Sequence, residues 1–219
     1  MKKQLLKSAL IAVAGVGLLA SGASAVMVTT SYTGDNIVDT FYIQDGVATD
    51  LSAGPNRENW RISDTFSIDL TGGHSYSFVW EVTNVGSMSE SNPAAFLGEV
   101  DFGGTTNYFS NITWKYAREV AGSTPTSNFD DVGWVWNSVT VYGYNGGSNI
   151  WTNNNSGSPV TGISTSAQWI WSELNFIPEG DQKLFIRADF TAVPEPTTML
   201  LFGTGLLGLA AAARRRTNS

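Results

Sequence analysis

Apolar and polar residues alternate with period two along much of the chain, a pattern typical of β-strands that bury one face. In residues 61–70 the positions that share a face are Ile62, Asp64, Phe66, Ile68 and Leu70. Residues 76–82 repeat the pattern, and their shared face holds Tyr76, Phe78, Trp80 and Val82. Because Thr71-Gly72-Gly73-His74 supplies turn residues between the two runs, the sequence predicts a β-hairpin here.

Further short apolar runs are separated by Gly-, Asn- and Ser-rich turns, and none shows an apolar stripe of helical period. The other predicted strands are residues 26–32, 37–44, 95–102, 111–116, 132–144, 168–176 and 183–191. Many short strands with frequent turns and no intervening helices indicate an all-β domain. The predicted fold is an antiparallel β-sandwich or jelly roll.

The N-terminal segment, residues 1–25, has the layout of a secretory signal peptide. Lys2, Lys3 and Lys7 precede a short apolar run, and Ala23 and Ala25 supply the small residues at positions −3 and −1 of a cleavage site. The chain is therefore expected to use the general secretion machinery and signal peptidase.

The C-terminal end has the layout of a second targeting segment. Pro194-Glu195-Pro196 precedes an uncharged run over residues 197–213, which is followed by Arg214, Arg215 and Arg216. Seventeen residues of helix reach roughly 25 Å, the lower limit for a membrane span. The arginines favour the cytoplasmic side, so everything before Val193 is expected to lie outside.

A Pro-Glu-Pro motif, an apolar run and a basic cluster in this order resemble the PEP-CTERM sorting signal of exported proteins from Gram-negative, exopolysaccharide-producing bacteria. The resemblance is confined to residues 193–216. It implies recognition by an exosortase-like membrane peptidase, cleavage at or near Pro194-Glu195-Pro196, and delivery to the cell surface, outer membrane or extracellular matrix. Before cleavage, the single C-terminal transmembrane helix would hold the chain transiently in the inner membrane. The resemblance also implies a structural role or one associated with exopolysaccharide and biofilm.

These boundaries divide the chain into three parts: a signal peptide (residues 1–25), an exported β-sandwich (residues 26–192) and a sorting signal (residues 193–216). The sorting signal is subdivided into the motif (193–197), the transmembrane helix (197–213) and the basic cytoplasmic cluster (214–216).

Charge and cysteine content narrow the function of the exported part. Six of the twelve basic residues lie in the two ends, and Glu195 is one of the nineteen acidic residues, so residues 26–193 carry 6 − 18 = −12. This charge repels nucleic acid and anionic lipid, which excludes nucleic acid as an expected partner. Because cysteine is absent, disulfides and cysteine nucleophiles are excluded.

Tryptophans are the candidate ligand contacts, since all eight lie in the exported part. The pairs Trp134/Trp136 and Trp169/Trp171 have the spacing that places two rings on one face of a strand, where sugar rings stack, and Trp151 lies between polar loops as a candidate exposed ring. The speculative carbohydrate contacts are Trp134, Trp136, Trp151, Trp169 and Trp171. The alternative, which burial of large aromatics favours, is that the rings fill the core.

No catalytic residues are predicted, and the protein is expected not to be an enzyme. His74, the only histidine, lies in a turn without a serine-elbow motif, and a solvated turn residue is its expected role. Two carboxylates of a glycoside hydrolase remain an alternative, because eighteen acidic residues are present without any marked pair. Neither a metal site nor a cofactor is predicted; the oxygen-rich segments at Asp130-Asp131 and Glu99/Asp101 leave calcium as an alternative.

Overall fold

The computed structural model describes residues 25–103, 107–119, 129, 133–176 and 180–190. The described residues between 26 and 190 form one compact unit. Most of the predicted signal peptide lies outside the described residues, including Ala23. The sorting residues Pro194, Glu195 and Pro196, the span 197–213 and the arginines that follow also lie outside them.

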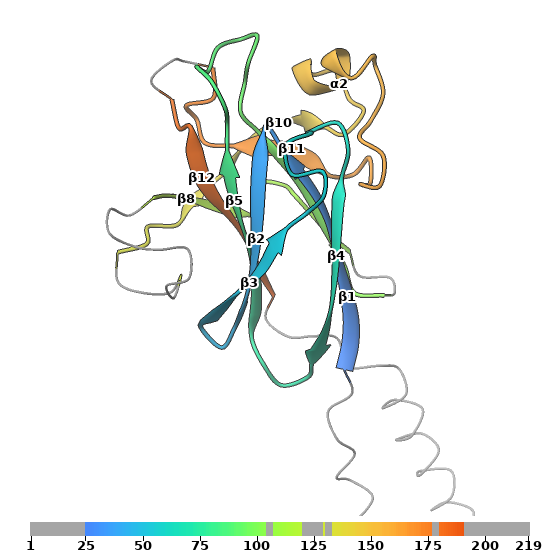
Figure 1. The fold of residues 1–219 in the computed structure, drawn as a ribbon, viewed down its shortest axis with the longest axis vertical. Coiled ribbons are helices and arrows are strands. Elements are labelled where there is room, and N and C mark those ends of the chain that lie inside the picture. The colour runs from blue at the N-terminus through green and yellow to red at the C-terminus, as the bar shows by residue number, and fades with distance from the viewer. Residues whose placement is uncertain (1–24, 104–106, 120–128, 130–132, 177–179, 191–219) are drawn as a thin grey trace, which may run out of the picture. The chain divides into compact units, whose positions relative to one another are not determined.

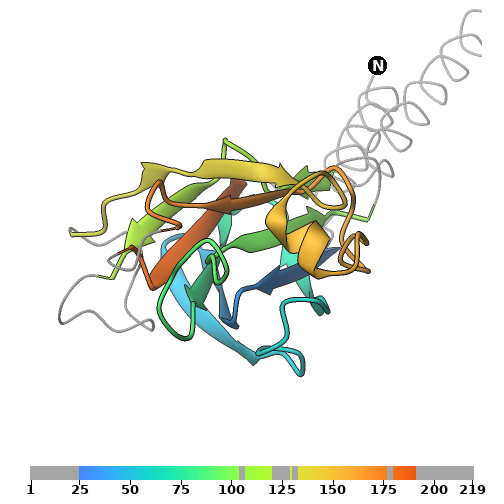
Figure 2. The same cartoon turned by 90° about the horizontal axis from the view of Figure 1, so that it is seen from above.

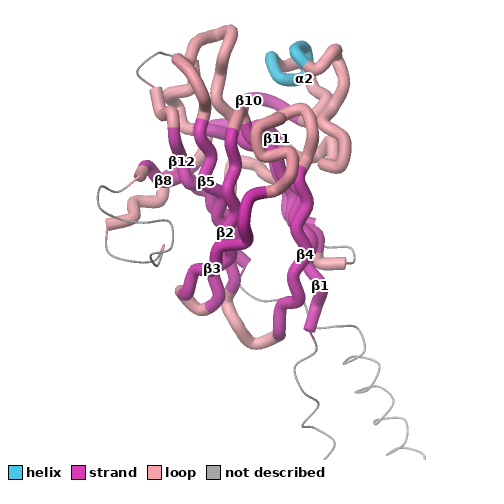
Figure 3. The backbone as a smooth tube through the Cα atoms, in the orientation of Figure 1, coloured by secondary structure: helices cyan, strands magenta, loops and turns pink. Residues whose placement is uncertain are grey.

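Two antiparallel sheets make up this unit, which confirms the predicted all-β sandwich (Figures 1 and 3). Sheet A has the strand order β10 (Thr140–Tyr144), β11 (Gln168–Trp171), β6 (Phe96–Asp101), β1 (Ala25–Gly34) and β4 (Asp64–Thr71), and β7 (Asn107–Phe109) pairs with β6. Sheet B has the order β3 (Val47–Ala53), β2 (Ile37–Gln44), β5 (Tyr76–Thr83), β12 (Lys183–Phe190), β8 (Lys115–Arg118) and β9 (Asn137–Ser138).

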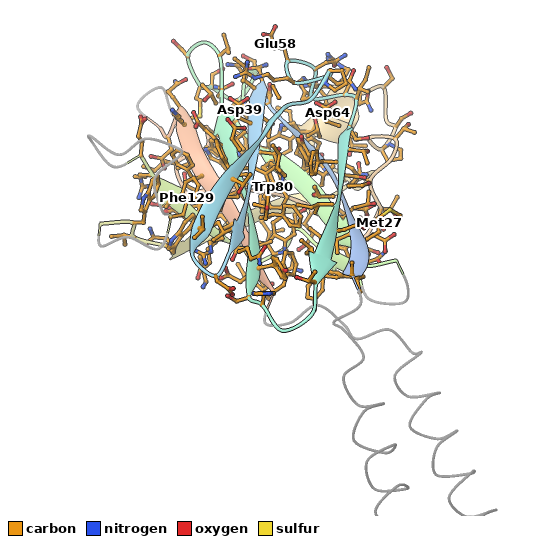
Figure 4. The ribbon with its side chains drawn as sticks, turned by 60° about the horizontal axis from the view of Figure 1, so that its bottom comes forward. Met27, Asp39, Glu58, Asp64, Trp80 and Phe129 are labelled. Atoms are coloured by element: carbon orange, nitrogen blue, oxygen red, sulfur yellow. The ribbon has the colours of Figure 1, made fainter. Side chains whose placement is uncertain are left out.

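The main core lies between the sheets and takes one face from each. Trp80 of β5 is at its centre, stacked on Trp114 with ring centroids 5.2 Å apart and 5.0 Å from Phe96 of sheet A (Figure 4). The predicted shared face of residues 76–82 is correct, because Tyr76, Phe78, Trp80 and Val82 all belong to this core. Burying aromatic rings on this scale supplies the largest favourable contribution to folding.

Both sheets are also covered on their outer faces, which explains why β5 and β11 are buried along most of their length on both faces. On sheet A, a second cluster packs Trp60, Trp151, Val160 and Ile163 against Leu97 and Trp169. On sheet B, a third cluster packs Phe129, Trp134 and Trp136 against Phe41, Val79 and Phe185.

The segment that covers sheet A includes the short helix α2 (Ile150–Asn154), which is seen beside one end of β10 and β11 in Figure 2. Asn149 caps this helix by accepting a hydrogen bond from the Thr152 amide at 2.9 Å. Asn145, buried below, donates to the Ile163 carbonyl at 2.9 Å and accepts from the Val160 amide at 2.8 Å. Amide side chains therefore hold an Asn-rich loop against the sheet.

The predicted hairpin of residues 61–82 is wrong, because β4 and β5 belong to different sheets. The connection crosses from one sheet to the other, and the Tyr76 hydroxyl fastens it by donating to the Thr71 carbonyl at 3.0 Å. Both strands turn an apolar face to the same core, and alternation cannot distinguish a hairpin from two strands that face each other. Ile62 also falls outside β4, and 48% of its surface is exposed.

A hairpin does form between β2 and β3, of which only the first strand is predicted from the sequence. Its two-residue turn is Asp45-Gly46, with φ of 49° and 84°, the left-handed conformations that such a turn requires. The Asp-Gly pair is the sequence signal that could have predicted this turn.

Two other predicted strands need correction. Residues 132–144 are divided between the sheets, with β9 in sheet B and β10 in sheet A. Residues 111–116 contain only the start of β8, since the Asn111 carboxamide oxygen accepts from the Thr113 amide at 2.7 Å and forms a turn.

Candidate functional site

Six of the eight tryptophans are buried, so the core interpretation holds for them. Trp151, the candidate exposed ring, is 2% exposed, and this prediction is wrong. Its ring stacks on Trp169 with centroids 5.1 Å apart, because the amide-fastened loop folds back onto sheet A. A residue between polar loops is therefore not necessarily solvent-exposed.

Trp169 and Trp171 do not form a joint platform either. Trp169 belongs to the second cluster, on the outer face of sheet A, whereas Trp171 belongs to the main core between the sheets. The strand ends at Trp171, whose indole nitrogen donates to the Asp181 carbonyl at 3.2 Å, so strict alternation does not extend to this residue. Both rings are at most 1% exposed and cannot contact a polysaccharide.

Trp134 and Trp136 are only half buried, and the structure brings them together as predicted, with ring centroids 6.1 Å apart. The two rings stack on each other instead of lying side by side. The Arg187 guanidinium lies over the Trp136 ring at 5.2 Å, and the Trp136 indole nitrogen donates to the Phe129 carbonyl at 3.3 Å. This stack therefore joins the third cluster to a charged group on β12.

Arg187 belongs to a network of four residues on the outer face of sheet B, here called the β12 network. Its members are Ser77, Lys115, Arg187 and Asp189. The Asp189 carboxylate accepts from Arg187 Nε at 2.5 Å, from Ser77 Oγ at 2.8 Å and from Lys115 Nζ at 3.1 Å. Burial alone would raise the pKa of Asp189, but hydrogen bonds from Arg187 and Ser77 outweigh it and the pKa is lowered. Asp189 therefore carries its charge at neutral pH.

A hollow of about 310 Å³ opens beside this network at the end of β12. Its lining includes Gly46 of the β2–β3 turn, Ser77, Arg187, Asp189 and Phe190. No sequence pattern predicted a site at these residues. The available signal was the pair Arg187 and Asp189, two charges on the same strand face as the apolar Phe185.

His74 lies nearby without the geometry of a catalytic triad. Its Nδ1 is 2.5 Å from an Asp45 carboxylate oxygen, while the Ser75 hydroxyl donates to the other Asp45 oxygen at 3.2 Å. The serine is thus bonded to the acid and not to the histidine, whereas nucleophilic activation requires a serine–histidine bond. The hydrogen bond from His74 lowers the pKa of Asp45, and the three residues fasten the β2–β3 turn to the start of β5.

The segments considered for calcium are only partly described. Glu99 accepts from the Ser164 amide at 2.9 Å and Asp101 from the Gly103 amide at 2.8 Å, while Asp130 and Asp131 lie outside the described residues. Within the described part of the chain, no group of three or more His, Asp or Glu side chains is arranged to hold a metal ion. The calcium alternative stays a prediction.

Comparison with protein families matches residues 192–216 to the PEP-CTERM protein-sorting motif. The chain therefore carries a PEP-CTERM sorting signal. This confirms the resemblance seen in the sequence and its restriction to the C-terminal end. No curated protein and no solved structure matches the chain.

The PEP-CTERM signal marks a surface protein that is exported and processed at a membrane by exosortase, a membrane peptidase. Among the residues that the structure describes, no helix is long and apolar enough to span a membrane.

The PEP-CTERM signal begins two residues beyond Phe190, the last residue of β12. β12 is an interior strand, paired with β5 along its whole length and with β8. Phe190 is 3% exposed, and its ring packs edge-on against Phe102 and Tyr108 at 5.2 and 5.0 Å. The folded domain is therefore well packed up to Phe190, two residues before the sorting signal begins.

Proposed function

We propose that the exported β-sandwich is a non-enzymatic surface or extracellular-matrix protein that associates with exopolysaccharide in a biofilm. The observation that carries this proposal is the PEP-CTERM signal at residues 192–216, which follows the last strand of the sandwich almost directly. A sorting signal of this kind delivers a folded product outside the inner membrane. The net charge of −12 on residues 26–193 keeps that product soluble in a hydrated matrix.

Two features support a structural role over catalysis. The described polar side chains near His74 are bonded in an arrangement that fastens a turn, as shown above. Six tryptophans are used to fill cores, which builds a rigid body without disulfides. A glycoside hydrolase remains the rival from another functional class, and its acid pair would have to lie 5 to 10 Å apart, roughly, across a groove.

The sorting part of the proposal is tested by replacing Pro194, Glu195 and Pro196 with alanine in the native host. We expect the full-length precursor to accumulate in the membrane fraction, because the motif that the peptidase recognises is gone. Intact-mass analysis and cell fractionation measure both effects. Unchanged mass and unchanged location of the mature protein would show that the motif is not used.

The polysaccharide part is tested with mature protein purified from the host and exopolysaccharide from the same cells. We expect co-sedimentation without any increase in reducing ends. Release of reducing ends that stops on substitution of one Asp or Glu would establish the hydrolase instead. No co-sedimentation at any protein concentration would remove the polysaccharide association.

A dedicated carbohydrate-binding module is a second candidate, favoured by the half-exposed Trp134 and Trp136. In that case Trp136→Ala abolishes co-sedimentation, while Trp136→Phe retains most of it because a ring face remains. Binding through a broad surface instead leaves both variants near the wild type.

A further inference from the structure

The end of β12 limits where the processing enzyme can work. Phe190 is held in the sandwich, and three residues separate it from Pro194, so four residue-to-residue steps join the two. Even fully extended, this length of chain spans at most about 14 Å. A peptidase that acts at or near Pro194-Glu195-Pro196 must therefore come within that distance of the end of β12.

The surface at that end is the hollow, which is lined by Ser77, Arg187 and Asp189 of the β12 network. Lys115, the fourth residue of the network, reaches its edge through the 3.1 Å contact with Asp189. Phe190 and Asp189 both line the hollow, so it adjoins the point from which the chain leaves the sandwich. The side chains of Lys115 and Asp189 are 48% and 39% exposed, while Ser77 is buried. Three donors hold the Asp189 carboxylate in one orientation, which makes the rim a preorganised polar surface.

We propose that this hollow and its charged rim form the docking surface for exosortase while the sorting signal is processed. The proposal rests on the sorting function above. A rim that carries an ammonium and a carboxylate 3.1 Å apart suits a polar loop of a protein, which can offer complementary donors and acceptors. An anionic lipid surface fits less well, because the exported region carries −12 and repels it.

The test compares two neutralising substitutions on one strand, Lys115→Gln and Arg118→Gln. Both residues are on β8 with similar side-chain exposure, 48% and 45%, but Arg118 pairs with Asp181 and Glu173, away from the hollow. In the native host, we expect Lys115→Gln to slow conversion of precursor to mature protein about three-fold, and Lys115→Gln with Asp189→Asn about ten-fold. We expect Arg118→Gln to leave conversion unchanged. Pulse-chase labelling measures the rate, and thermal unfolding of the mature variants checks folding.

A longer connection separates docking from other effects. Ten Gly/Ser residues inserted between Thr191 and Ala192 relax the distance limit, since such a linker averages about 5–6 Å times the square root of its length. We expect the insertion to remove the effect of Lys115→Gln. Wild-type conversion in Lys115→Gln and in the double variant, or equal slowing with and without the insertion, overturns the docking proposal.

The outcome is distinguishable from failure of the sorting function itself. If alanine at residues 194–196 leaves processing intact, the sorting function fails. If that variant blocks processing but the rim variants are processed normally, the docking proposal fails alone. Normal processing of Lys115→Gln with loss of its co-sedimentation would assign the hollow to polysaccharide and overturn docking.

Discussion

Asp35 is a carboxylic acid buried where β1 passes to β2, and 5% of its surface is exposed. Its amide donates to the Ala95 carbonyl at 2.9 Å, but one carboxylate oxygen, Oδ1, has no hydrogen-bond partner among the described residues. Burial raises its pKa to about 6, although Arg61 opposes the shift. Below about pH 6 the folded state therefore holds Asp35 as the protonated acid.

This shift predicts how stability depends on pH. Between about pH 4 and 6 the folded state holds a proton that the unfolded state has released, so the free energy of unfolding falls as pH rises. The contribution is full below the unfolded pKa and is lost as pH passes 6. A shift from 3.8 to about 6 corresponds to a loss of about 3 kcal/mol at most.

We expect Asp35→Asn to remove this slope and to stabilise the protein at pH 7 by about 1–3 kcal/mol, because asparagine stays neutral. Urea unfolding of mature protein at pH 4 and pH 7 measures the difference. Asp69→Asn, at an exposed position of β4, is the matched control and should leave the pH dependence as in the wild type. A slope that persists in Asp35→Asn would assign it to other groups.

At the scale of elements, the alternation of apolar and polar residues predicted where many strands lie but not which strands pair with each other. It placed residues 76–82 correctly because every second side chain enters the main core. It could not reveal that β4 and β5 belong to opposite sheets, since the same apolar pattern is found in two neighbouring strands of one sheet and in two strands of opposite sheets. The joining of β9 to β10 into one predicted strand has the same cause, because Val139 between them is buried in the core.

The candidate site was harder to predict than the fold. The Trp134/Trp136 pair was correctly expected to lie together, but spacing does not show that the rings stack on each other with Arg187 over one of them. Trp151 is buried because Asn145 and Val160, which precede and follow it in the chain, are hydrogen-bonded to each other and fold the loop onto sheet A. The residues of the β12 network come from three strands. Their contacts depend on how these strands pair in the folded protein, which no local sequence pattern shows.

The β2–β3 turn gives an element-scale prediction. Gly46 has φ of 84°, and a side chain in this left-handed region costs about 1–2 kcal/mol. We therefore expect Gly46→Ala to lower the free energy of unfolding by about 1 kcal/mol, measured by urea denaturation.

Gly72→Ala is the matched control for this turn. A Cβ added there meets no atom within 4 Å, and its φ is outside the left-handed region. We expect its stability to stay within about 0.5 kcal/mol of the wild type. Equal losses in the two variants would point to a general effect of replacing loop glycines.

At the scale of the whole molecule, the exported region combines a dense aromatic core with a strongly acidic surface. Its six basic residues are Arg57, Arg61, Lys115, Arg118, Lys183 and Arg187. Five of them form ion pairs in the structure, and Arg61 lies over the Trp60 ring. Since eighteen acids face six bases, local pairing leaves a net charge of −12 distributed over the surface. Self-repulsion of this charge opposes the compact state.

Salt should therefore stabilise the mature protein. Raising NaCl from 0.01 to 0.15 M shortens the screening length from about 30 to about 8 Å, which weakens repulsion between distant acids. Screening also weakens the surface ion pairs, but each of these contributes only about 0–1 kcal/mol. We expect the melting temperature to rise by a few degrees, measured by thermal unfolding at pH 7. Because the repulsion disappears when the acids are protonated, the same salt step at pH 3.5 should raise it much less. A melting temperature that falls with salt at pH 7 would mean that the ion pairs, including those of the β12 network, outweigh the repulsion.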